Sequence, residues 1–270
     1  MQYGKIEGVN KPVSRIVQGT NGFISTNDPD SSFRLLDTAL EMGITTFDTA
    51  HIYGNGDVER IFGQWMKARN NRDDVVLIAK GAHHNADRRR VTGFDIEADI
   101  HDSMIRLQTD YFDIYMLHRD DENAPVEPVV EKLHDYQQKG VIGVYGGSNW
   151  SVERIQAAND YAAANGFSAF VCSSPNYSLA DQVKEPWDNC ITISGHSNDN
   201  NRDGYADTQM ALFTWSSLAG GFFSGRFTRD NLESFDNYFD KVVIDAYVSD
   251  ENFQRLDRAK MLAAEKEMSV

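Results

Sequence analysis

Apolar and polar positions along this chain alternate between two periods, one typical of strands and one typical of helices. Residues 45–62 contain one full alternation. They begin with β-branched and aromatic residues, pass a turn rich in glycine and asparagine, and end with apolar residues three and four positions apart. A period near 3.6 indicates an amphipathic helix, and a short β-branched run indicates a strand. The segment therefore predicts a strand, a loop and a helix in succession.

The same alternation continues along the chain after a predicted hairpin at about residues 1–12. The predicted strands cover residues 15–20, 45–50, 75–80, 112–118, 141–148, 169–174 and 211–217. The predicted helices run from 31 or 32 to about 42, and over 57–69, 95–108, 128–139, 151–166 and 249–266, with an irregular segment at 178–209 whose polar insert is 197–204. Alternating strands and helices favour a parallel sheet with helices outside it. Seven units in one run favour an α/β barrel, yet a barrel needs eight strands to remove its edges, so we expect the eighth strand–helix unit to lie outside this chain or to be replaced.

Composition fits one large domain over residues 1–270. Hydrophobic residues make up 41% of the chain and aromatic residues 11%, which is ample for a large core. The formal charge of −15 argues against nucleic acid and anionic membranes as partners. Cys172 and Cys190 are the only cysteines, which suggests a reducing compartment without a disulfide framework. No signal peptide and no run of about 18 apolar residues is seen, so we expect a cytoplasmic protein; the oligomeric state is not indicated.

Three strands in succession end on polar or ionisable residues. Asp48 closes TTFD, Lys80 closes VVLIAK and His118 closes YMLH. The carboxyl ends of neighbouring parallel strands meet at one face, where the loops of such folds carry their chemistry. Tyr53 stands in the loop just after Asp48. The sequence therefore predicts that these four side chains cluster at one mouth; the plainer alternative is that Asp48 caps a turn and Tyr53 packs on a helix.

The charges of this cluster suggest a reaction. A buried Lys80 requires an anion, and Asp48 supplies one. The ammonium beside Tyr53 is expected to lower the pKa of the phenol from ~10, so that Tyr53 can protonate an alkoxide as it forms. A neutral His118 can hydrogen-bond a carbonyl oxygen and polarise it. Together these groups predict carbonyl reduction, provided that a hydride donor lies alongside.

Several segments carry a resemblance to a known family: DTAHIYGNGDVER, LIAK, YMLHRDD, YGGSNW and LFTWSSLAGGFFSGRF. In this order and spacing they resemble the aldo-keto reductase family over nearly the whole chain. The resemblance implies a TIM (β/α)8 barrel, NADPH as cofactor, no metal, and Tyr53 as general acid/base in a set with Asp48, Lys80 and His118. The family's final strand and the loop that binds the adenosine phosphate are not visible here, so NADP rather than NAD is inherited from the family.

The resemblance also implies a set of cofactor-binding residues. Ser148 and Asn149 match the Ser-Asn pair that holds the nicotinamide amide, and Asp48 adjoins the same site. Ser174 stands where the family usually has glutamine, and Trp215 stands where a tyrosine commonly stacks on the nicotinamide, which an indole can also do. The remaining expected contacts, along the pyrophosphate and after the first strand, are Ser216, Leu218, Gly220 and Thr20.

Two other functions stay open at this stage. Reductase-like barrels can act as nucleotide-sensing regulatory subunits of other proteins, with little turnover of their own. A metal-dependent barrel hydrolase or isomerase would instead use histidines at the mouth, which are His51, His83, His84 and His118. The substrate itself cannot be named from sequence, because the long loops that shape such pockets are individual to each chain.

Overall fold

The computed structural model describes residues 1–270 and divides into two compact units, Met1–Ser173 and Ser174–Val270. Each unit is described by itself below. The expectation of a single domain over the whole chain stays a prediction. No helix in the chain is both long and apolar enough to cross a bilayer.

Parallel strands that follow one another in chain order build the centre of the first unit. They are β3 (Val17–Gly19), β4 (Thr46–Asp48), β5 (Val76–Gly81), β6 (Phe112–Leu117) and β7 (Ile142–Ser148), and β8 (Cys172–Ser174) runs across the unit boundary. Every residue of β5 and β6 is buried, which explains why both strands are mostly apolar, with Lys80 and Asp113 as their charged residues. In register, Asp48 lies opposite Ile78 and Lys80 opposite Met116.

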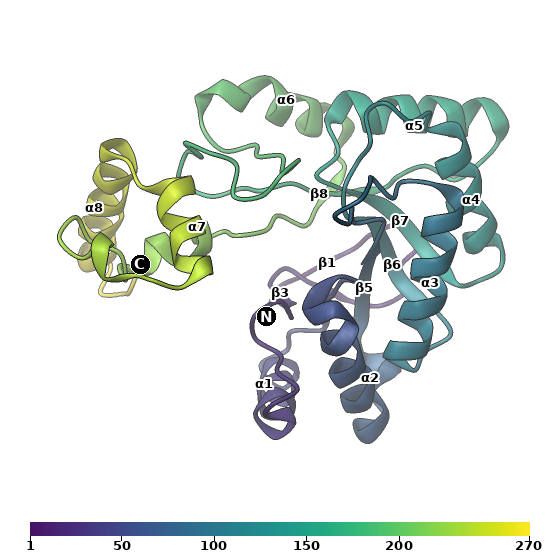
Figure 1. Cartoon of the computed structure of the whole chain (residues 1–270), viewed down its shortest axis with the longest axis horizontal. Coiled ribbons are helices and arrows are strands. Elements are labelled where there is room, and N and C mark those ends of the chain that lie inside the picture. Colours follow the sequence, from purple (N-terminus) through teal and green to yellow (C-terminus); the bar gives the residue numbers. More distant parts are fainter. The chain divides into compact units, whose positions relative to one another are not determined.

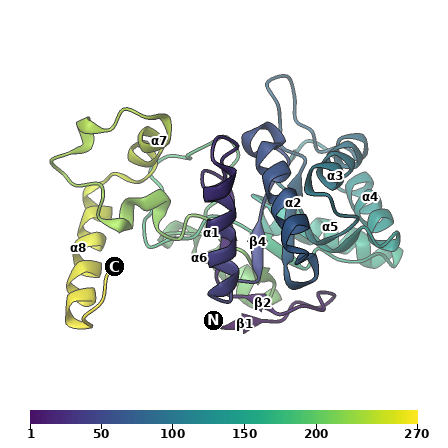
Figure 2. The ribbon, with the colours of Figure 1, turned by 90° about the horizontal axis from the view of Figure 1, so that it is seen from below.

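Helices of the first unit lie outside these strands, as Figures 1 and 2 show. They are α1 (Pro29–Glu41), α2 (Asp57–Arg69), α3 (Gly93–Leu107), α4 (Glu127–Gln138) and α5 (Val152–Asn165). Ser151 caps α5, since its hydroxyl accepts a hydrogen bond from the Arg154 amide at 3.1 Å. The predicted start of α1 at residue 31 or 32 is wrong. The helix begins earlier because Asp28 caps it and Pro29, with its fixed φ, occupies the first turn.

The predicted N-terminal hairpin is confirmed as an antiparallel pair of β1 (Tyr3–Gly4) and β2 (Val13–Ser14). It covers the N-terminal ends of the central strands. The Ser14 amide donates to Thr46 Oγ1 at 3.0 Å, and Lys11 Nζ donates to the Val75 carbonyl at 2.8 Å. The hairpin therefore does not cover the carboxyl ends of the strands, where the candidate residues lie.

The second unit is mostly helical. It contains β9 (Ala211–Leu212), α6 (Asp199–Thr208), α7 (Tyr238–Tyr247) and α8 (Asp250–Glu265). Short 3-10 turns in the two units are η1 (Tyr53–Gly56), η2 (Arg72–Asp74), η3 (His196–Asn198), η4 (Ala219–Ser224) and η5 (Leu232–Ser234). The strand predicted at 211–217 is shorter in the structure, where it comprises only the two residues of β9. An isolated β-bridge also joins Asn176 to Trp215. The polar insert at 197–204, expected to be irregular, lies largely in α6, a helix with one buried residue and hence no apolar period.

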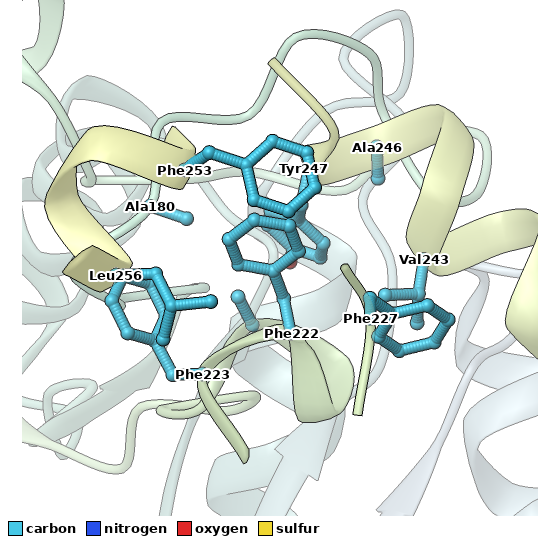
Figure 3. Close-up of a cluster of buried hydrophobic side chains, with 10 residues drawn as sticks. Ala180, Phe222, Phe223, Phe227, Val243, Ala246, Tyr247, Phe253 and Leu256 are labelled. Carbon is cyan, nitrogen blue, oxygen red and sulfur yellow. The ribbon is translucent and has the colours of Figure 1, made fainter. Parts of the chain in front are cut away.

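Aromatic side chains form the core of the second unit. Phe222 and Phe223, from η4, pack with residues of α7 and α8 (Figure 3). The Phe222 and Phe253 rings lie 5.1 Å apart. The cluster comprises Ala180, Ala219, Phe222, Phe223, Phe227, Val243, Ala246, Tyr247, Phe253 and Leu256. This unit thus has its own hydrophobic centre, built largely by segments that the strand and helix periods left unassigned.

Candidate active site

The carboxyl ends of β4, β5 and β6 bring the predicted polar residues together in the first unit. The ladder continues past the strands, since the His51 amide donates to the Lys80 carbonyl and the His118 amide to the Gly81 carbonyl, both at 2.8 Å. Tyr53 opens η1, where Gly54 and Asn55 take positive φ values of 54° and 53°. This tight turn returns the chain toward the strand ends and places the Tyr53 hydroxyl beside Lys80.

Lys80 is the centre of the cluster. Its Nζ forms an ion pair with Asp48 Oδ1 and lies 3.4 Å from both the Tyr53 hydroxyl and the Thr49 carbonyl. The Lys80 side chain is only 4% exposed. Burial alone would lower the pKa of this ammonium, but Asp48 and then Tyr53 outweigh burial, so the pKa of Lys80 stands above its ordinary value. Lys80 is therefore a fixed positive charge next to a phenol.

The predicted lowering of the Tyr53 pKa is wrong. Burial of the phenol raises the pKa of Tyr53 above its ordinary value, and the lowering influence of Lys80, though present as predicted, is smaller. Sequence fixes which charge stands nearby but not how much water is removed. At neutral pH the Tyr53 hydroxyl keeps its proton, as a proton donor must.

His118 completes the group. Its ring meets the Tyr53 ring edge-to-face, with centroids 5.6 Å apart and planes at 84°. Burial, and then the positive charges of Lys80 and Arg119, hold the pKa of His118 well below its ordinary value, so the imidazole is neutral near pH 7. The Nδ1 atom of His118 is buried and has no hydrogen-bond partner within the protein. The structure thus assembles all four predicted catalytic side chains; their roles stay predictions.

Two predicted cofactor residues lie next to this cluster. Ser148 and Asn149 are both buried. Ser148 ends β7, and Asn149 follows it and turns the chain with a φ of 58°. Asn149 Nδ2 donates to the His118 carbonyl at 3.3 Å and to Ser148 Oγ at 3.2 Å. An amide and a hydroxyl at this position fit a carboxamide group bound beside His118. Thr20 is also buried, and its amide and hydroxyl donate to the Asp48 carbonyl at 3.0 and 2.9 Å. Its role as a cofactor contact stays a prediction.

The other predicted cofactor residues belong to the second unit. Backbone there turns tightly, with φ values of 56° at Ser216, 63° at Gly220 and 99° at Gly221. Trp215 has a buried indole Nε1 without a hydrogen-bond partner, and Leu218 is 49% exposed. A turn of this kind with an unpaired indole N–H fits a bound polar ligand. Ser174, at the end of β8, and this turn stay predictions as cofactor contacts.

The histidines near the mouth do not form a metal-ligand set. No group of three or more His, Cys, Asp or Glu side chains in the chain could hold a metal ion. His51 Nε2 turns instead toward Asp102 at 3.2 Å and Asp99 at 3.5 Å. The structure therefore shows no set of metal ligands of the kind that the metal-dependent alternative requires.

Arg119 is a neighbour of the cluster that sequence reasoning missed. It is buried, its Nη1 donates to the His118 carbonyl at 2.9 Å, and its charge lowers the pKa of His118. The feature of the sequence that could have identified Arg119 is its position directly after His118, a histidine at the end of a strand. An arginine in YMLHRDD reads as an ordinary loop residue until its burial is known.

Comparisons with known proteins show what this chain is similar to. The model of the Aldo/keto reductase family matches residues 15–270. The chain is 29% identical over 262 residues to the aldo-keto reductase YhdN of Bacillus subtilis, covering 92% of this chain and 73% of that protein. It is 28% identical over 212 residues to an aryl-alcohol dehydrogenase (NADP+) of Phanerodontia chrysosporium, covering 73% of this chain and 51% of that protein.

A solved structure shares the fold. A glycerol dehydrogenase of Gluconobacter oxydans matches with a TM-score of 0.76 at 22% identity, covering 98% of this chain and 79% of that chain. With the family match and the parallel strands β3 to β7 in chain order, this likeness confirms the predicted α/β, TIM-barrel-type fold.

Proposed function

Because this chain belongs to the aldo/keto reductase family, we propose that it is an oxidoreductase that reduces an aldehyde, ketone or sugar carbonyl to an alcohol, or runs the reverse reaction. Tyr53 is the general acid/base of this proposal. The observation that carries it is the placement of Lys80 Nζ, which lies 3.4 Å from the Tyr53 hydroxyl while paired with Asp48. The relatives share the carbonyl/alcohol chemistry in their names but no single substrate, so the proposal names a class of substrate.

Each residue of the cluster has one task in this proposal. The chemistry that a reduced nicotinamide would supply when bound is a hydride for the carbonyl carbon. Tyr53 gives its hydroxyl proton to the carbonyl oxygen in the same step, so that the alcohol forms and a phenolate remains. The Lys80 ammonium stabilises that phenolate, and Asp48 keeps the buried ammonium charged. The product alcohol leaves, and Tyr53 regains a proton from solvent.

His118 orients the carbonyl. A buried ring N–H without an acceptor is costly, so the tautomer with Nδ1 unprotonated is favoured and the proton resides on Nε2. That N–H can donate to the substrate oxygen. A neutral donor suits this role better than an imidazolium, because a second full charge beside Lys80 would be repelled.

Ser148 and Asn149 would hold the carboxamide of the nicotinamide beside His118. The proposed cofactor is NADPH, for which the support is the NADP+ named for the Phanerodontia chrysosporium relative. The further proposed cofactor contacts are Ser174, Trp215, Ser216, Leu218 and Gly220.

Turnover of carbonyls tests the proposal. NADPH or NADH consumption is followed at pH 7 with a panel of aliphatic and aromatic aldehydes, ketones and aldoses. We expect reduction of at least one carbonyl class, faster with NADPH than with NADH. Tight binding of either nucleotide without turnover of any panel member would refute the proposal and favour the regulatory-subunit alternative.

A further inference from the structure

His83 borders the proposed catalytic group without a role in it so far. It follows Lys80 by three residues, and its half-buried ring packs edge-to-face on His118, with centroids 4.9 Å apart and planes at 75°. Tyr53 meets the same His118 ring. His83 and Tyr53 therefore both border the His118 ring that, in the proposed function, donates to the carbonyl oxygen.

The backbone at His83 is held firmly from behind. Ala82 takes a left-handed φ of 60°, and its amide donates to Asp99 Oδ2 at 2.8 Å. Arg90 pairs with Asp99 at 2.5 Å and donates to the His83 carbonyl at 3.5 Å. A non-glycine residue stays in the left-handed region only where its surroundings fix it. The His83 ring is thus presented by an ordered segment.

One hydrogen bond determines the chemistry that His83 presents. Its Nδ1 lies 2.8 Å from the His84 carbonyl oxygen. A carbonyl oxygen only accepts, so Nδ1 carries the proton. Burial, with the charges of Arg119, His84 and Arg90, lowers the pKa of His83 to about 4, so the ring is neutral at pH 7. Its other nitrogen, Nε2, is then a hydrogen-bond acceptor only.

We propose that His83 determines substrate specificity, with Nε2 accepting a hydrogen bond from a hydroxyl group on the carbon next to the substrate carbonyl. This inference rests on the proposed function and adds the substrate class to it. Hydroxy-aldehydes and hydroxy-ketones would satisfy the acceptor, whereas an alkyl group of the same size would leave it unpaired against apolar atoms. The preference concerns the group beside the carbonyl, and the reacting oxygen is still held by Tyr53 and His118.

A packing role for His83 would have a different signature. If its ring only steadied His118, removing the acceptor while keeping an aromatic ring would leave the choice between substrates unchanged. Any loss of rate would then fall equally on hydroxylated and alkyl substrates.

The experiment compares two isosteric substrate pairs, glycolaldehyde with propanal and hydroxyacetone with butanone. In each pair a hydroxyl replaces a methyl group. Wild type, His83→Phe and His83→Gln are assayed for kcat/KM with NADPH at pH 7, and circular dichroism verifies their folding. Because hydration and intrinsic reactivity of each carbonyl are the same for every variant, the change in the ratio within a pair isolates the residue.

We expect His83→Phe to lower the hydroxyl-over-methyl ratio by roughly three- to tenfold, as one half-exposed hydrogen bond allows, with propanal and butanone changed less than about threefold. His83→Gln, which retains an acceptor, is expected to keep part of the preference, and it tests the inference if the phenylalanine variant does not fold. An unchanged ratio in folded variants overturns the inference while leaving the reductase proposal intact. Absence of turnover of every carbonyl by wild type overturns both.

Discussion

Replacing Asp48 with asparagine removes the carboxylate that pairs with a buried ammonium and leaves the shape of the side chain almost unchanged. The Lys80 side chain is 4% exposed and that of Asp48 is 20% exposed. Removing one partner of a fully buried ion pair typically destabilises a protein by about 3–5 kcal/mol, because the other charge stays buried without compensation. Water at Asp48 reduces the expected loss here to roughly 2–4 kcal/mol.

The pH dependence of this loss has a definite sign. In wild type the pKa of Lys80 is raised on folding, so its stabilisation is present below the unfolded pKa of ~10.4 and disappears only as the pH rises through the higher folded value. Asp48→Asn removes the carboxylate that raises the pKa of Lys80 most, while burial still lowers that pKa. We therefore expect the pKa of Lys80 in the folded variant to fall below ~10.4. The variant then gains stability as the pH rises toward that value, because its unfolded chain binds more protons.

Urea unfolding at pH 7 and at pH 9.5 measures both effects. The difference between wild type and Asp48→Asn is expected to be largest at pH 7 and smaller at pH 9.5. Asp245→Asn is the matched control, since Asp245 pairs with Lys184 at 2.8 Å on the surface and should change stability by less than about 1 kcal/mol. A loss below about 0.5 kcal/mol at pH 7, or a loss that does not shrink at pH 9.5, would refute the reasoning on Lys80.

Two packing predictions concern the two units separately. Phe222→Ala empties the centre of the aromatic cluster in the second unit, where Phe222 is fully buried, and should lower the free energy of unfolding by about 3–5 kcal/mol in urea titrations; a loss under 1 kcal/mol would mean that the cluster is not a core. Gly146→Ala in β7 would bring a methyl group within 2.1 Å of the Cys172 carbonyl oxygen and should cost about 1–3 kcal/mol or more. Gly19→Ala, which meets no atom within 4 Å, is its control in thermal unfolding, and equal midpoints for the two variants would contradict this account.

Sequence reasoning predicted that the four candidate side chains lie together because the signal for it is local. Each strand is an apolar run ended by one polar residue, and parallel strands in chain order must bring those ends together. The hairpin and α2 also followed from local turn residues and an apolar period. These features depend on neighbours in sequence, which the chain shows directly.

The features that escaped prediction depend on a balance or on distant neighbours. The pKa of Tyr53 rises because burial outweighs Lys80, and only coordinates show how much water is excluded. The helix α6 has almost no apolar face, so the sequence shows no apolar period there that would predict a helix. The sequence suggests His83 only as one of the histidines of the metal-dependent alternative. Its Nε2 is identified as an acceptor only because the structure shows Nδ1 beside the His84 carbonyl oxygen.

The rate of a single turnover in Tyr53→Phe tests the central claim most directly. Enzyme preloaded with NADPH is mixed with a carbonyl that wild type reduces, and nucleotide absorbance is followed at pH 7. Tyr161→Phe, which loses an exposed hydroxyl bonded to Glu131, serves as the control and should match wild type. Loss of the positioned proton donor predicts a fall of about 100- to 10,000-fold in Tyr53→Phe with nucleotide binding retained. A Tyr53→Phe rate equal to that of wild type would contradict the assignment of Tyr53 as the acid.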